Sequence, residues 1–250
     1  IYKAMHSDIL TVMGISDGEL NYERIEGHTF LTEKRNIYRA KGIIKKNEST
    51  GLNRADGVEK GMIQIGETIY YDRKQLADDY LGCNVECYAE LKDGDTYGEI
   101  IYVEESGNNK TVTLRDDDIV GVDGNTISYY DDDKIKSLNM AVILFWIYKR
   151  GGFYFRAEFT LDSLKSLDNA DIKFIDNNGD GAYEVVIVTE YSVRVVNSVN
   201  MDEKKITFRF DEKPIELENS FYRIFRDGKK SKLGDINSGD VVLSAISKDV

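Results

Sequence analysis

The sequence predicts an all-β protein with minor helix, built from tandem small β-barrel or sandwich modules. From Thr29 onward, short runs rich in Ile, Val, Tyr and Thr recur at roughly ten-residue intervals, which is typical of small barrels and sandwiches. Asp-Gly, Gly-Asp, Asn-Asn and Gly-Asn pairs separate these runs and favour turns. Helical periodicity is scarce. Together the three observations favour strands over helices for most of the chain.

Individual elements follow the same reasoning along the chain. Apolar spacing over residues 1–15 predicts a short helix that ends near Gly14, and residues 76–82 and 161–168 each fit one or two helical turns. The longest apolar run, Met140–Tyr148, is too short to cross a bilayer, which needs about 20 residues, and is predicted to be a buried strand. The clearest strand patterns lie at 62–71, 98–105, 110–116, 125–133, 170–176, 183–191 and 204–210.

A weak internal repeat suggests the domain organisation. Three segments share an opening strand, a polar turn, a strand pair, a connector and a closing strand. The last one closes on a turn and strand typical of SH3-like or OB-like barrels, and the longer second one is alternatively a module with an inserted hairpin. The predicted division is a helical or linker segment at 1–35, β modules at 36–107 and 108–190, and a small β-barrel module at 191–250.

Composition limits the classes of partner. Lys and Arg number 33 against 45 Asp and Glu, a formal net charge of −12. Such a balance argues against a nucleic-acid surface, which needs basic patches. It fits hard divalent cations, and it fits equally a surface that is acidic only for solubility. Cys83 and Cys87 lie ~13 Å apart if the segment is a strand, too far for a disulfide, so both are predicted to be free core residues.

The sequence holds no catalytic constellation, and we expect no enzyme. His6 and His28 are remote from any nucleophile-elbow pattern, and neither a P-loop nor a Rossmann glycine pattern occurs. The acidic triplets 116–118 and 131–133 sit beside strands, where consecutive side chains point to opposite faces, so we interpret them as solvated turns. Tyrosine is abundant; we favour cross-strand packing for these rings over a carbohydrate or protein contact surface.

Residues 176–184, Asp-Asn-Asn-Gly-Asp-Gly-Ala-Tyr-Glu, form the segment with metal-binding character. Side-chain oxygens recur at positions 1, 3, 5 and 9, and a glycine at position 6 permits the sharp turn that closes a cage. Position 12 is Ile187 and the flanks are strand-like, so the loop is no EF-hand. The predicted Ca²⁺ ligands are Asp176, Asn178, Asp180, Glu184 and the backbone carbonyl of Ala182.

With three carboxylates, such a site would suit extracellular calcium, where modules bind in the ~10⁻⁴–10⁻³ M range. Its role would be to stiffen a β-hairpin. The alternative is an ordinary hairpin turn that binds nothing.

Several of these runs resemble the non-catalytic β-rich region of Firmicutes cell-surface proteins that often carry S-layer homology domains. The resemblance covers residues 36–249, and its most specific part is the Asp-Asn-Asn-Gly-Asp-Gly loop with its flanking strands. The other matching runs are 38–53, 62–71, 78–91, 116–133 and 233–249.

The resemblance implies a secreted or wall-attached structural or adhesive protein without known enzymatic activity. The start at Ile1 leads us to expect a piece of a longer chain, and the short apolar run predicts no membrane span. The partners that the resemblance implies are other protein modules of the same assembly, and cell-wall polymer or glycan. Similar modules occur in phage virions, so a tail or capsid decoration protein is the alternative, as is a module that binds wall or host glycans.

Overall fold

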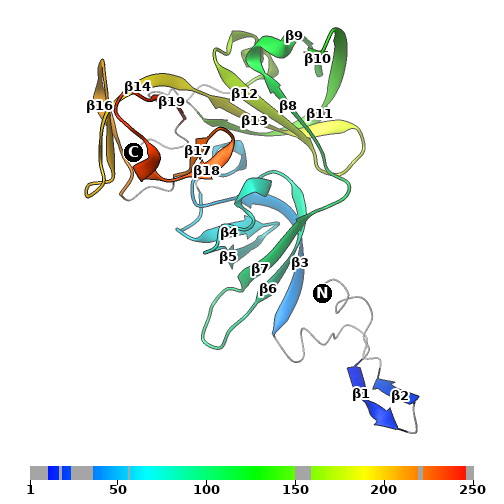
Figure 1. The fold of residues 1–250 in the computed structure, drawn as a ribbon. Coiled ribbons are helices and arrows are strands. Elements are labelled where there is room, and N and C mark those ends of the chain that lie inside the picture. The colour runs from blue at the N-terminus through cyan, green and yellow to red at the C-terminus, as the bar shows by residue number, and fades with distance from the viewer. Residues whose placement is uncertain are drawn as a thin grey trace. The chain divides into compact units, whose positions relative to one another are not determined.

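A computed structural model describes residues 11–16, 19–23, 36–55, 57–149, 159–218 and 222–245. Strands dominate these residues, which confirms the all-β prediction (Figure 1). The chain divides into two compact units, one of residues 1–47 with 61–109 and one of residues 48–60 with 110–250. Residues 48–60, expected in the first module, therefore group with the second unit. Residues 191–250, expected as a separate module, group with residues 110–190.

The N-terminal segment is a hairpin where it is described. Strands β1 (Thr11–Ser16) and β2 (Glu19–Glu23) pair antiparallel, so the predicted helix is wrong for residues 11–16. The physical reason is local: Thr11, Val12 and Ile15 are β-branched and favour strands, and the following Asp-Gly pair is a strong hairpin signal. The rest of that prediction, residues 1–10, lies outside the described residues.

The first unit contains a closed five-stranded barrel in the order β3-β4-β5-β7-β6. Strand β3 pairs antiparallel with β4 and β6, and β5 pairs parallel with β7. This Greek-key order is that of the OB-fold. A one-turn 3₁₀ helix, η2 (Asp78–Tyr80), lies between β5 and β6. The strands are β3 (Ile37–Lys46), β4 (Met62–Ile65), β5 (Thr68–Tyr71), β6 (Asn84–Glu90) and β7 (Glu99–Glu105).

The barrel closes tightly where β3 passes the turn between β4 and β5. Gly42 has a φ of +154°, and a Cβ atom there would lie 3.1 Å from the backbone nitrogen of Gly66. That nitrogen donates to the Ile43 carbonyl at 2.8 Å. Cys83 and Cys87 are buried and outside any disulfide, as predicted.

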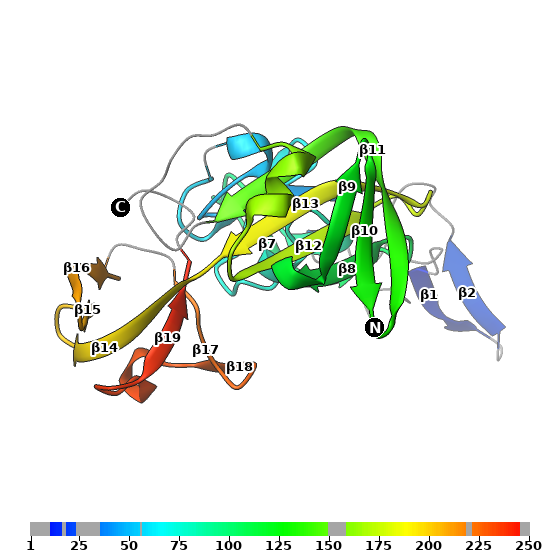
Figure 2. The same cartoon turned by 90° about the horizontal axis from the view of Figure 1, so that it is seen from above.

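The second unit contains a six-stranded mixed sheet in the order β8-β12-β13-β11-β10-β9 (Figure 2). Only the β11–β13 pair is parallel. The strands are β8 (Lys110–Arg115), β9 (Ile119–Asp123), β10 (Thr126–Asp131), β11 (Lys134–Lys149), β12 (Ala170–Asp176) and β13 (Ala182–Glu190), and the short 3₁₀ helices are η1 (Leu52–Arg54), η3 (Asp116–Asp118) and η4 (Leu161–Ser166). Its core includes Leu114, Ile127, Leu164, Ile172, Phe174, Val186 and Val188.

Strand β11 carries a register break that corrects one prediction. Met140 pairs with Tyr183 and Phe145 with Val185, so Ala141–Leu144 stand opposite the single residue Glu184. The apolar run is a strand, as predicted, but it is not buried throughout: Val142 is 91% and Ile143 72% exposed. Among the described residues, no helix has the length and apolar character that a membrane span requires.

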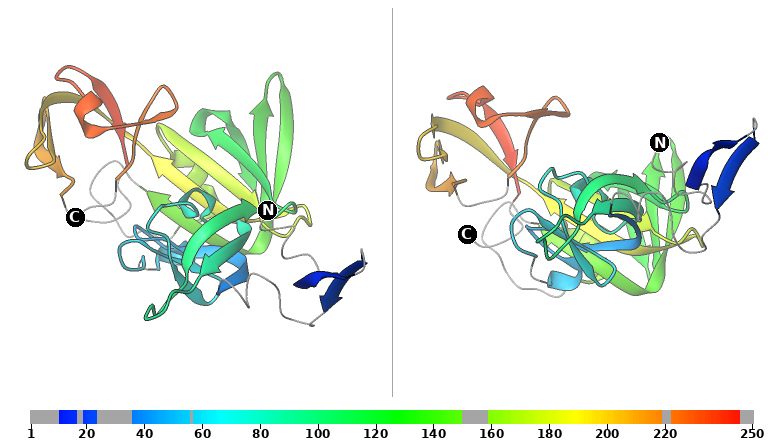
Figure 3. Two further views of the ribbon diagram at one scale, coloured as in Figure 1. Left: turned by 60° about the horizontal axis from the view of Figure 1, so that its bottom comes forward. Right: turned by 90° about the horizontal axis from the view of Figure 1, so that it is seen from below.

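The C-terminal strands form an open sheet in the order β16-β15-β14-β19, with a separate hairpin of β17 and β18 (Figure 3). The strand pairs of the described residues do not close a ring there, and the predicted small barrel at 191–250 stays a prediction. Strand β14 pairs with β19 through its first half and with β15 through its second half, and no ring closes. The elements are β14 (Ser192–Asn200), β15 (Lys205–Phe208), β16 (Asp211–Glu216), β17 (Ile224–Arg226), β18 (Lys229–Ser231), η5 (Leu233–Asp235) and β19 (Val241–Ser244).

The close approach at Gly42 yields a prediction. Gly42→Ala places a methyl group against the Gly66 backbone at an unfavourable φ, and we expect it to lower the free energy of unfolding by about 1–3 kcal/mol. Gly107→Ala, where a Cβ meets nothing within 4 Å, is the matched control. Urea denaturation of both variants measures the difference. Equal stabilities would contradict the packing described here.

Candidate metal site

The loop of residues 177–181 joins β12 and β13 near the centre of the six-stranded sheet. The two strands pair antiparallel, with Ile175 opposite Val185 and Phe174 opposite Val186, all fully buried. Asp176 is the last residue of β12 and pairs with Lys110 in β8. The predicted acidic hairpin loop is thus present, and its base is fixed by the core of the sheet.

Asp176 is the organising residue of the loop. Its side chain is 0% exposed. The Oδ1 atom accepts hydrogen bonds from the backbone nitrogens of Gly179 at 2.6 Å and Asn178 at 3.3 Å, and Oδ2 accepts one from Gly181 at 3.0 Å. Both glycines have positive φ, +83° and +93°, so the chain can wrap around this carboxylate. Lys110 Nζ lies 3.8 Å from Oδ2 and offsets part of the charge.

The other predicted side chains converge on the same place. Asn178 Nδ2 donates to Asp180 Oδ2 at 3.2 Å and to Glu184 Oε1 at 2.7 Å, so its amide bridges two carboxylates. Asn178 Oδ1 accepts from the Asp180 nitrogen at 2.8 Å. The second oxygen of Glu184 accepts from the backbone nitrogen of Asn177 at 2.9 Å. Each acidic side chain therefore keeps a defined orientation.

Three carboxylates lie within reach of one cation. One oxygen each from Asp176, Asp180 and Glu184 lies within 4.8 Å of the others. Ligands bound to a single Ca²⁺ ion at about 2.4 Å can lie no more than about 4.8 Å apart, so this spacing is compatible with a shared ion. The group can hold a metal ion.

The electrostatics of the cluster favour a cation. Burial raises the pKa of Glu184 first, and the nearby charges of Asp176 and Asp180 raise it further, against the lowering effect of the Asn177 hydrogen bond. A proton or a metal ion would each relieve this repulsion.

The predicted ligands differ in how far the structure brings them together. Asp176, Asp180 and Glu184 form the cluster, whereas Asn178 turns its nitrogen toward it and would need a half-turn of the amide to offer its oxygen. The Ala182 nitrogen donates to Asp180 Oδ1 at 2.8 Å, and ligation by the Ala182 carbonyl stays a prediction. Lys110 was missed because only the β8–β12 pairing brings it here.

The acidic triplets have other roles. Asp116 accepts from the backbone nitrogens of Asn169 at 3.0 Å and Ala170 at 2.9 Å, and Asp118 accepts from that of Arg115 at 2.8 Å. Asp131 forms an ion pair with Lys136. Within the ranges that the structure describes, the loop cluster is the only group of three such ligands. The side chains of the triplets accept hydrogen bonds from backbone N–H groups or pair with a lysine, and they do not converge on one metal-binding point.

The barrel carries an aromatic cluster that sequence patterns did not single out. Tyr71 and Tyr97 meet edge to face with centroids 5.7 Å apart, and the Arg73 guanidinium carbon lies 3.8 Å from the Tyr71 centroid. Arg73 also pairs with Glu99 at 2.6 Å. Only the parallel β5–β7 pairing places these residues together.

Comparison of the chain with protein families, with curated proteins and with solved structures gives no match.

Without divalent ions, the loop carboxylates contribute unequally to the free energy of unfolding. We expect Asp176→Ala to lower the free energy of unfolding by about 1–3 kcal/mol, because it leaves partly buried backbone donors of the loop unpaired. Asp180→Ala removes an exposed group from a repulsive cluster and should change it by less than about 1 kcal/mol. Chemical denaturation in a chelator measures both. A larger cost for Asp180→Ala would contradict this assignment.

The raised pKa of Glu184 gives a pH dependence. Because the folded chain binds this proton more tightly than the unfolded chain, the contribution to stability is complete below the unfolded pKa and is lost as pH rises through the folded pKa. Carbon NMR of the Glu184 carboxyl in a chelator should give a midpoint above the ordinary value of 4.5. Calcium should lower that midpoint. A chelator midpoint below 4.5 would contradict the repulsion described here.

Proposed function

We propose that the chain is a non-catalytic structural or adhesive module of a cell surface, and that calcium stiffens its second unit. The observation that carries the proposal is the cluster of three carboxylates at the loop between the neighbouring interior strands β12 and β13. A cation bound there would tie the end of one core strand to the start of the next. The role is mechanical, because each ligand comes from the hairpin itself.

Calcium is the ion that the donor set favours. All the side-chain donors are oxygens, carboxylates with one amide, and neither sulfur nor imidazole contributes to the cluster. Such hard donors prefer Ca²⁺ and Mg²⁺ over softer transition metals. The loop is short and irregular, with two glycines at positive φ, and its ligand spacing is not that of a regular octahedron, which suits Ca²⁺ better than Mg²⁺.

The stiffening follows from linkage. An ion that binds the folded hairpin and not the unfolded chain stabilises the folded state, by about 2.7 kcal/mol when its concentration is 100 times the dissociation constant. Asp176 belongs to the core while Asp180 lies at the exposed tip. The ion would therefore couple the exposed tip of the loop to the buried end of β12, and local opening of the hairpin would become rarer.

The proposed setting is the extracellular surface. Three carboxylates give a site of modest affinity, which would be filled at the millimolar calcium found outside cells. The acidic surface, the β-sheet units and the resemblance to Firmicutes surface proteins support the same setting. The proposed partners are neighbouring modules of the assembly and wall polymer. The virion and glycan-binding alternatives stay predictions.

Calcium should raise the melting temperature of the native chain. In a two-state unfolding unit of this size, a gain of about 2.7 kcal/mol corresponds to roughly 5–11 °C. Asp180→Asn should lose most of the shift because it removes a ligand charge at the exposed tip. Asp133→Asn removes an equal charge from an exposed turn away from the site and should keep the shift.

Differential scanning calorimetry in a chelator and in millimolar calcium provides the measurement. A native chain without a calcium shift, or equal shifts for the native chain and Asp180→Asn, would overturn the proposal.

A further inference from the structure

Asn178 and Gly179 form the only Asn-Gly pair in the sequence, and the pair lies near the tip of the loop between β12 and β13. Asparagine is a heat-labile residue. A following glycine leaves the next peptide nitrogen unhindered, because glycine has no side chain. That nitrogen can attack the carbonyl carbon of the asparagine side chain. The pair is therefore the place in the chain where a backbone nitrogen reacts most readily with a neighbouring carboxamide.

The labile side chain is accessible to water. Asn178 is exposed and Gly179 is half-buried, whereas the preceding Asn177 is 4% exposed. Loss of the amide as ammonia consumes one water molecule, so the reaction requires a position that solvent reaches. Asn178 meets this requirement and Asn177 does not.

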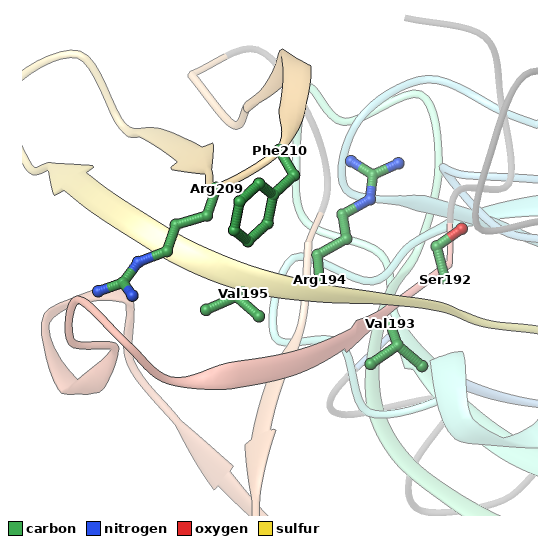
Figure 4. Close-up of a pocket in the computed structure, with 6 residues that line it drawn as sticks. All are labelled: Ser192, Val193, Arg194, Val195, Arg209 and Phe210. Carbon is green, nitrogen blue, oxygen red and sulfur yellow. The ribbon is translucent and has the colours of Figure 1, made fainter.

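The turn at Phe210 shows what the Asn-Gly pair adds to an exposed turn. Phe210 has a φ of +66° and is 100% exposed, and Figure 4 shows its ring standing above β14. None of the six residues labelled in Figure 4 carries a carboxamide or a carboxylate. Exposure and a positive φ occur there without a group that the backbone could attack. At the acidic loop they occur together with one.

The Asn178 side chain folds back along the Gly179 peptide. Its Oδ1 atom accepts a hydrogen bond from the backbone nitrogen of Asp180, two residues further on, at 2.8 Å. This bond closes an Asx-turn, in which the side chain takes the place of a backbone turn. Because Oδ1 reaches past Gly179, the carbonyl carbon of the side chain stays on the side of the Gly179 nitrogen. The two atoms that would react are thus neighbours in the closed loop.

Hydrogen bonds keep these neighbours from reacting. The Gly179 N–H donates to Asp176 Oδ1 at 2.6 Å and so points to the buried carboxylate. Asn178 Nδ2 donates to Asp180 Oδ2 at 3.2 Å and to Glu184 Oε1 at 2.7 Å, which fixes the plane of the carboxamide. Attack requires the nitrogen to release its proton and to approach the carbonyl carbon from above that plane. Both sets of bonds must break first.

Local opening of the loop would break them. Asp180 lies at the exposed tip, while Asp176 is 0% exposed at the end of β12. Segments of this kind open without unfolding of the sheet that carries them. A hydrogen bond to a charged acceptor shifts such an equilibrium by about tenfold or more. We therefore expect the reaction to be slow in the closed loop and to proceed from the open one.

The reaction exchanges ammonia for water. The Gly179 nitrogen forms a bond to Asn178 Cγ, the bond from Cγ to Nδ2 breaks, and ammonia leaves with the proton that the Gly179 nitrogen gives up. The product is a five-membered cyclic imide. Water then opens the imide at either carbonyl. One opening gives aspartate at position 178, and the other gives isoaspartate, in which the backbone runs through the former side chain.

Both products change the acidic loop. Aspartate at position 178 adds a fourth carboxylate to the three that already lie together, and it offers an oxygen where the amide now directs its nitrogen. Isoaspartate adds one methylene to the backbone before Gly179, which displaces the Gly179 and Gly181 nitrogens from Asp176. The first product favours a cation, and the second disrupts the hydrogen bonds that shape the loop.

We propose that Asn178 and Gly179 form a self-modification site, which deamidates through a cyclic imide when the loop opens and which Asp176 keeps inactive while the loop is closed. The chain would then carry a covalent record of the time that its loop has spent open. The proposal does not depend on calcium, because the closed loop is held by hydrogen bonds of the chain itself.

The first test follows mass in the full chain, kept folded in a chelator at mildly alkaline pH. Trypsin releases residues 174–194, with Asn178, and residues 116–134, whose one asparagine is Asn125 in an exposed turn. We expect residues 174–194 to gain the mass of deamidation at least about tenfold faster, because a β-branched threonine shields the nitrogen that follows Asn125. Asn178→Gln should abolish this gain, since glutamine would have to close a larger ring. No gain in residues 174–194, or a gain that survives Asn178→Gln, would overturn the proposal.

The second test examines protection by Asp176. Unfolding the native chain in guanidinium chloride should speed deamidation at Asn178 at least about tenfold, because the hydrogen bond to the charged acceptor is then lost. Asp176→Ala should raise the rate of the folded chain to a similar extent. Asp133→Asn, an equal loss of charge in an exposed turn, should leave the rate unchanged. Equal rates for the folded and the unfolded native chain would contradict a closed, inactive loop.

Hydrogen exchange decides the case in which Asp176→Ala fails to fold, which a matching rise in deamidation at Asn125 would reveal. Exchange and imide formation both require release of the Gly179 N–H. The Gly179 amide of the native chain should therefore exchange more slowly than in the unfolded chain, by at least about tenfold. A Gly179 amide that exchanges as fast as in the unfolded chain would overturn the role of Asp176.

Discussion

The buried carboxylate of Asp176 is the interaction on which the functional geometry depends. It ends a core strand, accepts the backbone nitrogens of the loop that follows, and fixes where Asp180 and Glu184 lie relative to it. The wrapping of the loop requires glycine at positions 179 and 181. A charged group at 0% exposure is costly unless it is satisfied, and these hydrogen bonds satisfy it. A metal ion would therefore bind to a loop whose conformation the hydrogen bonds to Asp176 already fix.

Features set by local chemistry were predictable from the sequence. The Asp-x-Asn-x-Asp-Gly spacing places three oxygen-bearing side chains in one tight loop whether or not the rest of the fold is known, and the structure brings Asp176, Asp180 and Glu184 together. The absence of a Cys83–Cys87 disulfide follows from the length of a strand between the two residues, whereas residues 62–71, predicted as one strand pattern, form the two paired strands β4 and β5. In each case the cause acts within a few residues.

Features set by long-range pairing were not predictable in the same way. Lys110 reaches Asp176 only because β8 lies beside β12, and the exposure of Val142 results from a register break against β13. The division of β14's pairing between β15 and β19 is likewise a long-range feature that no local pattern indicates. The sequence of β14 alone does not indicate at which residues its pairing with β15 and with β19 ends.

Terbium luminescence tests the central claim most directly. Tyr183 adjoins Glu184 in the chain, so a Tb³⁺ ion in the calcium site should show green emission when tyrosine is excited. We expect terbium emission from the native chain that calcium displaces, and we expect most of this emission to be lost in Tyr183→Phe and in Asp180→Asn. Emission that calcium does not displace, or that survives in Asp180→Asn, would contradict a calcium site at this loop.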